Sequence, residues 1–128
     1  MDRKFEKFIG GPNVPNQHRL YVSLSKYNVI SLSNAAYERM GRPPAVYLHY
    51  SRSDDMIAVE PAASERVAAA FPVTVRGQHG WRIAASPFCQ HFNILHDATQ
   101  RFISPEVRDG CLFLNLSQTV TVRRRRRR

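Results

Sequence analysis

The sequence predicts a mainly β protein with two short helices, forming a small β-barrel-like body built from two related halves. Short runs of apolar and β-branched residues alternate with turn-forming residues along most of the chain. Helix signals occur twice, over residues 33–41 and 86–93. The 128 residues, 43% of them hydrophobic, suffice for one packed domain.

The first half, expected over residues 19–62, has the order strand, strand, helix, hairpin. Its strands are predicted by four apolar and β-branched runs: residues 20–24, 29–32, 46–50 and 56–59. Asn28 tolerates the positive φ that a tight turn needs. Ser33 or Asn34 offers an N-cap for a helix of about two turns, which Gly41 ends.

The second half, expected over residues 71–122, repeats this order after a linker over residues 63–70. Its strands are predicted at residues 71–75, 81–84, 101–103, 111–116 and 119–122, and the runs at 101–103 and 111–116 are expected to pair as a hairpin. Ser86 and Pro87 predict the start of a helix, with Ser as N-cap and Pro at its first position. Asn93 can end that helix in the left-handed conformation.

The two ends of the chain differ from this body. Residues 1–18 are expected to form a flexible arm, because Gly10, Pro12 and Pro15 interrupt any regular element. Residues 123–128 are six consecutive arginines, and adjacent like charges cannot be buried. We therefore expect them to be a disordered, solvated tail.

Three segments of the first half resemble a known family: Val29-Ile30-Ser31-Leu32-Ser33, Tyr37-Glu38-Arg39-Met40-Gly41 and Ile57-Ala58-Val59-Glu60-Pro61. Their order resembles the AbrB/SpoVT/MazE-like swapped-hairpin domains, and the second half follows it only loosely. The resemblance implies DNA binding as a dimer or as tandem copies, with basic residues of strands and helices facing the duplex. The family's Gly-Asp turn is replaced here by residues 42–45, and its proline at the helix start is absent.

The chain carries no sequence motif of an enzyme. The nucleophile-elbow, Walker, dinucleotide-binding and zinc-protease patterns are all absent. Asp54 and Asp55 are adjacent carboxylates, which a strand would point to opposite faces, so a turn explains them better. We expect no catalysis.

Four side chains carry donor atoms suited to zinc: Cys89, His91, His96 and Cys111. Their spacing matches no standard zinc motif, and a helix would place Cys89 and His91 on different faces. We expect the two cysteines to be reduced core residues, and we expect no metal or cofactor.

Charge is the unusual property of the composition. The formal net charge is +9, and it falls to +3 without the six arginines of residues 123–128. Guanidinium groups pair bidentately with phosphate oxygens, which predicts a polyanionic partner. The predicted nucleic-acid-binding residues are Lys26, Arg39, Arg42, Arg76, Arg82, Arg101, Arg123, Arg124, Arg125, Arg126, Arg127 and Arg128. Tyr27 and Trp81 lie at matching turn–strand junctions, where each ring can stack on a base or cover the core edge.

These observations predict a non-catalytic nucleic-acid-binding protein, with DNA favoured over RNA. A DNA-binding transcription regulator or nucleoid-type protein, cytoplasmic and homo-oligomeric as a dimer, is the first hypothesis. No stretch is long and apolar enough to span a bilayer, and we expect no membrane partner, although charge alone also fits an anionic membrane surface.

Two alternatives stay open. In an assembly protein of a phage particle or ribonucleoprotein, Phe5, Phe8 and Ile9 would dock on a neighbouring subunit and the arginine tail would line packaged nucleic acid. In an adaptor, the tail would meet an acidic protein.

Overall fold

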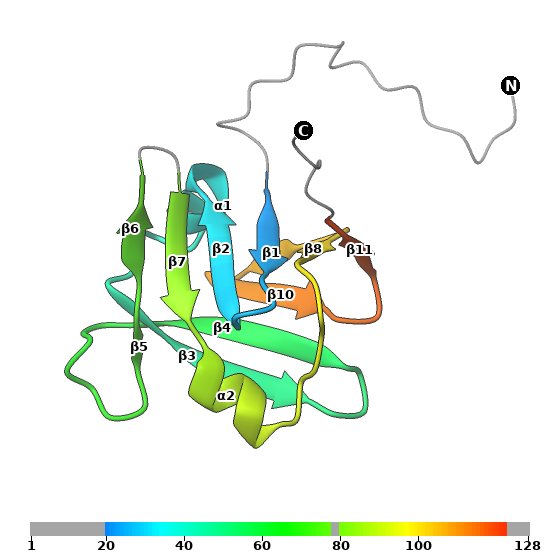
Figure 1. Cartoon of the computed structure of the whole chain (residues 1–128). Helices are drawn as coiled ribbons and strands as arrows, with labels where there is room; N and C mark the ends of the chain where they lie inside the picture. Colours follow the sequence, from blue (N-terminus) through cyan, green and yellow to red (C-terminus); the bar gives the residue numbers. More distant parts are fainter. Residues whose placement is uncertain (1–19, 78–79, 123–128) are drawn as a thin grey trace, which may run out of the picture.

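The computed structural model describes residues 20–77 and 80–122, whose strands form two antiparallel sheets (Figure 1). The elements are, in order, β1 (Val22–Leu24), β2 (Val29–Ser33), α1 (Asn34–Arg39), β3 (Ala45–Ser51), β4 (Met56–Ala62), β5 (Phe71–Pro72), β6 (Thr74–Arg76), β7 (Gly80–Ala84), α2 (Ser86–His91), β8 (Gln100–Phe102), β9 (Glu106–Arg108), β10 (Cys111–Asn115) and β11 (Thr119–Thr121). The six-stranded sheet has the order β11-β8-β1-β2-β7-β6, and the five-stranded sheet has the order β5-β3-β4-β10-β9. The prediction of a mainly β protein with two short helices is confirmed.

The two sheets share one hydrophobic core. Strands of the six-stranded sheet cross those of the five-stranded sheet at a wide angle (Figure 1). Fully buried side chains come from both sheets: Val22, Leu24, Ile30 and Ile83 from one, and Val46, Ile57, Val59, Leu112 and Leu114 from the other. Neither sheet could exclude water from its apolar face alone, so the packing of one on the other stabilises both.

The described strands do not close into a barrel. In place of the predicted barrel-like body, they form an open arrangement of two sheets. On one side, residues 71–76 pass from one sheet to the other, because β5 pairs with β3 and β6 pairs with β7. Between them the amide of Val73 donates to the carbonyl of Pro44 at 3.0 Å. On the opposite side, β11 and β9 are the edge strands of their sheets.

Strands β1 to β4 and strands β6, β7, β9 and β10 occupy equivalent places in the two sheets. β2 and β7 are neighbours near the middle of the six-stranded sheet, flanked by β1 and β6. β4 and β10 are neighbours in the five-stranded sheet, flanked by β3 and β9. Because β2 and β7 are antiparallel, the helices that follow them lie at opposite ends of the pair (Figure 1).

The hairpin expected from residues 101–103 and 111–116 is wrong in its first strand. Residues 100–102 form β8, which lies between β1 and β11, whereas β10 pairs with β9. The turn decides this pairing, because Asp109 and Gly110 both have positive φ, 54° and 80°. Two such residues in succession make the tight turn that a hairpin favours, and so the strand directly before them becomes the partner.

Of the two helices, only α1 has an N-cap hydrogen bond made by a side chain. The Oγ atom of Ser33 accepts from the amide of Ala36 at 3.3 Å, as an N-cap should. At α2 the predicted Ser86 cap is wrong: the cap position is Ala85, and the hydroxyl of Ser86 donates to the carbonyl of Tyr27 at 3.3 Å. Asn93 has a φ of 56°, which confirms the left-handed end. The predicted arm over residues 1–18 and the tail over residues 123–128 lie outside the described residues.

We predict that Ile83→Ala lowers the free energy of unfolding by about 3 kcal/mol, because it leaves a cavity where the two halves meet. Ile83 is directly opposite Ile30, and both side chains have 0% exposure. The matched control is Ile103→Ala, since Ile103 is 56% exposed and its loss should cost under about 0.5 kcal/mol. Urea unfolding of both variants measures the difference, and equal costs would contradict a shared core at this pair.

Candidate nucleic-acid interface

Alternation along β2 and β7 sets which side chains leave the core. Ile30 and Leu32 on β2 and Ile83 on β7 are buried against the five-stranded sheet. Successive side chains of a strand point to opposite faces, so Ser31 and Arg82 point outward. The outer face of the six-stranded sheet therefore carries the residues between the buried ones.

Strand register aligns four of these outward residues across adjacent strands. Arg82 on β7 is opposite Ser31 on β2, Ser31 is opposite Ser23 on β1, and Ser23 is opposite Arg101 on β8. Three strand spacings separate the two arginines, a distance of about 14 Å. We call Arg82, Ser31, Ser23 and Arg101 the arginine–serine row.

The two ends of the row are exposed, whereas its middle is covered by neighbouring side chains. Both arginines are exposed, whereas Ser23 is only 7% exposed. Arg76 on β6 reaches toward the row, since its Nη1 atom donates to the Oγ atom of Ser31 at 3.1 Å. Arg76 therefore brings a third guanidinium to the middle of the row, between the two exposed arginines.

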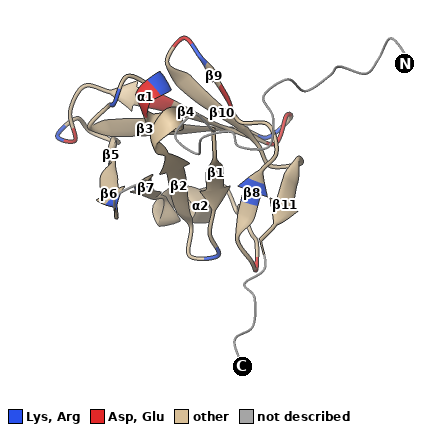
Figure 2. Cartoon of the chain, turned by 90° about the horizontal axis from the view of Figure 1, so that it is seen from above, with Lys and Arg blue, Asp and Glu red and all other residues tan. Residues whose placement is uncertain are grey.

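The six strands of this sheet contain arginines but no acidic residue. Among the described residues, nine Lys and Arg stand against eight Asp and Glu, so net charge does not distinguish this surface. The acidic residues lie elsewhere: Glu38, Asp54, Asp55, Glu60, Glu65, Asp97, Glu106 and Asp109. Figure 2 shows Lys and Arg on β6, on β8 and in the turn between β1 and β2. The placement of charge therefore makes this face basic.

The five-stranded sheet presents the contrasting case of mixed charge. Arg108 forms an ion pair with Glu106 at 3.3 Å, and the Nε2 atom of His49 lies 2.9 Å from the carboxylate of Glu60. Carboxylates beside cations reduce the attraction of a surface for phosphate. Of the two sheets, the six-stranded one is better suited to bind a polyanion.

Among the predicted binding residues, Arg76, Arg82 and Arg101 are brought onto one sheet. Lys26 lies in the turn between β1 and β2, with its Nζ atom 5.2 Å from the ring centre of Tyr27. Arg39 is exposed in the last turn of α1, off the strands. The six arginines from Arg123 to Arg128 lie outside the described residues, and along the chain they follow directly on Val122 beside β11.

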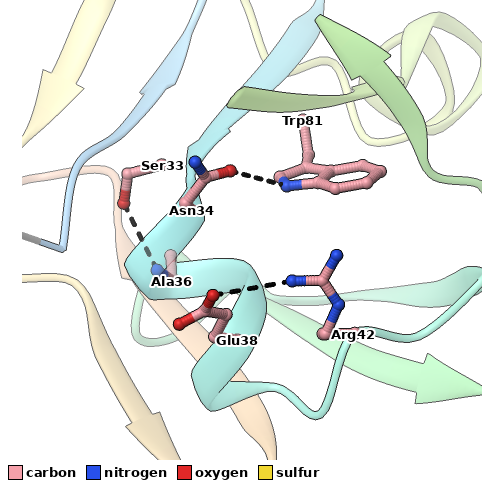
Figure 3. A network of polar contacts seen from close by, with 6 residues as sticks. All are labelled: Ser33, Asn34, Ala36, Glu38, Arg42 and Trp81. Carbon is pink, nitrogen blue, oxygen red and sulfur yellow. Dashed lines mark hydrogen bonds and ion pairs between the residues drawn. The ribbon is translucent and has the colours of Figure 1, made fainter. Parts of the chain in front are cut away.

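Arg42 takes part in a cluster with α1 and β7 (Figure 3). Its guanidinium carbon lies 5.5 Å from the ring centre of Tyr37 and 5.6 Å from that of Trp81, and its Nη1 atom is 3.5 Å from Glu38. The two rings stack at 4.1 Å, and Nε1–H of Trp81 donates to Asn34 at 2.9 Å. These contacts give Arg42 a structural role.

The two aromatic side chains at the matching junctions have different surroundings. Trp81 packs against the core and covers its edge, whereas Tyr27 is 72% exposed. In the cluster, the hydroxyl of Tyr37 donates to the carbonyl of Pro43 at 2.6 Å. Burial raises the pKa of Tyr37, and the nearby Arg42 guanidinium partly opposes that rise. The hydroxyl therefore stays protonated as a donor.

A cleft of about 500 Å³ lies at the end of β1 between the two sheets, and its lining includes Tyr50, Asp55 and His96. The hydroxyl of Tyr50 donates to Asp55 at 2.8 Å, which raises the pKa of Tyr50. The Nε2 atom of His96 is hydrogen-bonded to the carbonyl of Ser25. These bonds hold the β3–β4 turn and the segment after α2 in place.

Both cysteines are free thiols, and the structure explains one of them as a core residue. Cys89 on α2 is buried, which raises the pKa of its thiol to about 11. Cys111 on β10 is half-buried. Within residues 20–77 and 80–122 no group of three or more His, Cys, Asp or Glu side chains could hold a metal ion.

Comparison of the chain with family models, curated proteins and solved structures finds no match. In the part of the chain that the structure describes, no helix has the length and hydropathy needed to cross a membrane.

Sequence reasoning missed the serines between the arginines, and it missed Tyr21 beside them. The available signal was the period of two along β1 and β2, which places Tyr21, Ser23, Ser31 and Ser33 opposite to the apolar face.

We predict that a small maleimide at pH 8 modifies Cys111 in the native protein and leaves Cys89 largely unmodified. A thiol with a pKa near 11 holds almost no thiolate at that pH, and burial also blocks access. Mass spectrometry of peptides reads out each site, with the urea-denatured chain as the control in which both cysteines react. Equal native rates would contradict the burial of Cys89.

Proposed function

We propose that this protein binds nucleic acid without catalysis, through the outer face of its six-stranded sheet extended by the arginines at 123–128. The observation that supports this most directly is the arginine–serine row on a sheet whose strands have no acidic residue. DNA is the favoured ligand, as the resemblance of the first half to the AbrB/SpoVT/MazE-like domains suggests.

Phosphate contacts supply the affinity in this proposal. Arg82 and Arg101 are exposed at the two ends of the row, and each guanidinium presents a fork of donors that matches phosphate oxygens. Each neutralised phosphate releases counterions, so binding weakens as salt is added. Arg76, which donates to Ser31 in the middle of the row, adds a third guanidinium between the two arginines at its ends.

The biological role that fits is a DNA-binding transcription regulator or nucleoid-type protein, acting in the cytoplasm at the nucleoid as a dimer. The tail would anchor it to phosphates, and the sheet would supply any sequence preference.

A second candidate function is an assembly protein, and the edge strand β6 favours it. All three residues of β6 are exposed, and Val75 is 59% exposed. An exposed edge strand can pair with another chain. Sedimentation over a concentration series separates the two functions, because only the assembly protein grows beyond a dimer.

We predict that Arg82→Gln with Arg101→Gln weakens binding at least tenfold at moderate salt and makes the log–log salt slope shallower by nearly 2 on duplex DNA, because two phosphate contacts are lost. Fluorescence anisotropy with labelled oligonucleotides measures both quantities.

The matched control is Arg66→Gln with Arg108→Gln, which removes the same charge from a loop and from the five-stranded sheet. This pair should change the affinity much less. Equal losses in the two double variants would show that only net charge matters, and would contradict a site on the sheet.

We predict that deletion of residues 123–128 lowers affinity by a similar factor for every sequence and flattens the salt slope further, because the tail makes no base contacts. The residual binding should still depend on Arg82 and Arg101. If affinity and slope both survive the deletion, the tail is not an anchor.

A further inference from the structure

We propose that the preferred ligand of the outer face is single-stranded nucleic acid, with Tyr21 and Tyr27 stacking on unpaired bases while the arginine–serine row holds the backbone. This inference rests on the proposed function for the use of this surface, and it names a single strand as the preferred ligand in place of the duplex that the resemblance implies.

Tyr21 lies directly beside the row, on the same face of the sheet. Its amide donates to the Oγ atom of Ser33 at 3.0 Å and its carbonyl accepts from the amide of Ser33 at 2.8 Å, so the two residues are opposite each other. Ser23, which follows Tyr21 by two positions, belongs to the row. The Tyr21 side chain therefore points outward with that of Ser23, and it is 40% exposed.

A cation accompanies the Tyr21 ring. The guanidinium carbon of Arg101 lies 5.9 Å from the ring centre, within the range of a cation–π contact. Arg101 can therefore contact a phosphate next to a base that stacks on Tyr21. An aromatic ring beside a cation is the arrangement that single-strand-binding proteins use repeatedly.

Tyr27 offers a second exposed ring, in the turn beyond the other end of β1. Its ring is 72% exposed and lies 5.2 Å from the Nζ atom of Lys26. Its backbone is nevertheless held: the amide donates to Ser25 at 3.2 Å and the carbonyl accepts from Ser86 at 3.3 Å. A fixed backbone under an exposed ring lowers the entropy cost of stacking a base on it.

Tyr21 and Tyr27 are six residues apart. The extended stretch from Tyr21 to Ser25 spans about 13 Å, and Tyr27 follows in the turn between β1 and β2. Ser23 lies between them on β1, with Ser31 beside it. Single-strand sites of small β domains span about four nucleotides or more. One strand of nucleic acid can thus contact Tyr21, cross the row and reach Lys26 and Tyr27.

Duplex DNA fits this surface less well. The faces of paired bases are covered by their neighbours in the stack, so protein rings cannot stack on them. Reading the major groove needs a protruding helix or two-stranded ribbon. The outer face has short side chains along its middle strands, and both helices are six residues long and pack buried residues on the core.

The test compares the full chain binding to a labelled single-stranded oligodeoxynucleotide, a single-stranded RNA and the matching DNA duplex, in one buffer and salt series. We expect each single strand to bind at least tenfold more tightly than the duplex. Tyr21→Leu and Tyr27→Leu should each weaken single-strand binding about fivefold or more, because stacking on one ring is lost. Binding of the duplex should hardly change.

Two further variants make the result specific to the rings. Tyr27→Trp keeps a stacking platform, so it should retain the affinity, and its added indole fluorescence should be quenched by the single strand. Tyr47→Leu changes a half-buried tyrosine on the five-stranded sheet and should leave both affinities unchanged. Circular dichroism verifies that each variant folds.

Failure of this inference is distinguishable from failure of the proposed function. If the duplex binds as tightly as the single strands and the leucine variants are neutral, while Arg82→Gln with Arg101→Gln weakens all ligands, single-strand preference is overturned and the interface stands. If no nucleic acid binds at low salt, both are overturned.

Discussion

The antiparallel pairing of β2 with β7 is the constraint on which the rest of the structure depends. It joins the two halves of the chain, and it places Ile30 opposite Ile83 in the shared core. It also sends the two short helices to opposite ends of the sheet. Because side chains alternate along each strand, burial of this isoleucine pair forces Ser31 and Arg82 onto the outer face. The pairing of β2 with β7 therefore determines both which side chains fill the core and which ones reach the outer face.

In the described part of the chain, the placement of the charged side chains distinguishes the two sheets, whereas the net charge does not. The cations and carboxylates nearly balance, yet the carboxylates lie on α1, the five-stranded sheet and the loops. Arginines that were all predicted from the sequence as binding residues also have different surroundings in the structure. Arg82 and Arg101 end the row, whereas Arg42 stacks on Trp81 and pairs with Glu38. A cation committed to an internal cluster has less freedom to follow a phosphate backbone.

Most strands and turns could be predicted from sequence because their causes are local. Apolar runs indicate β2 and β10, and Asn28 takes the positive φ of 65° that its turn needs. The pairing of β8 with β1 could not be predicted, since it depends on which distant strand completes the sheet. The same limit applies to the candidate site. Arg82 and Arg101 are visible as cations in the sequence, but their alignment through two serines needs the register of four strands.

We propose that nucleic acid lies on the outer face of the six-stranded sheet, and backbone NMR of the ¹⁵N-labelled full chain is the most direct test of this placement. Titration with a single-stranded oligonucleotide should shift the amide signals of β1, β2, β7 and β8, and leave those of β3, β4 and β10 in place. Shifts concentrated on the five-stranded sheet, or no shift in any strand, would contradict binding on this face.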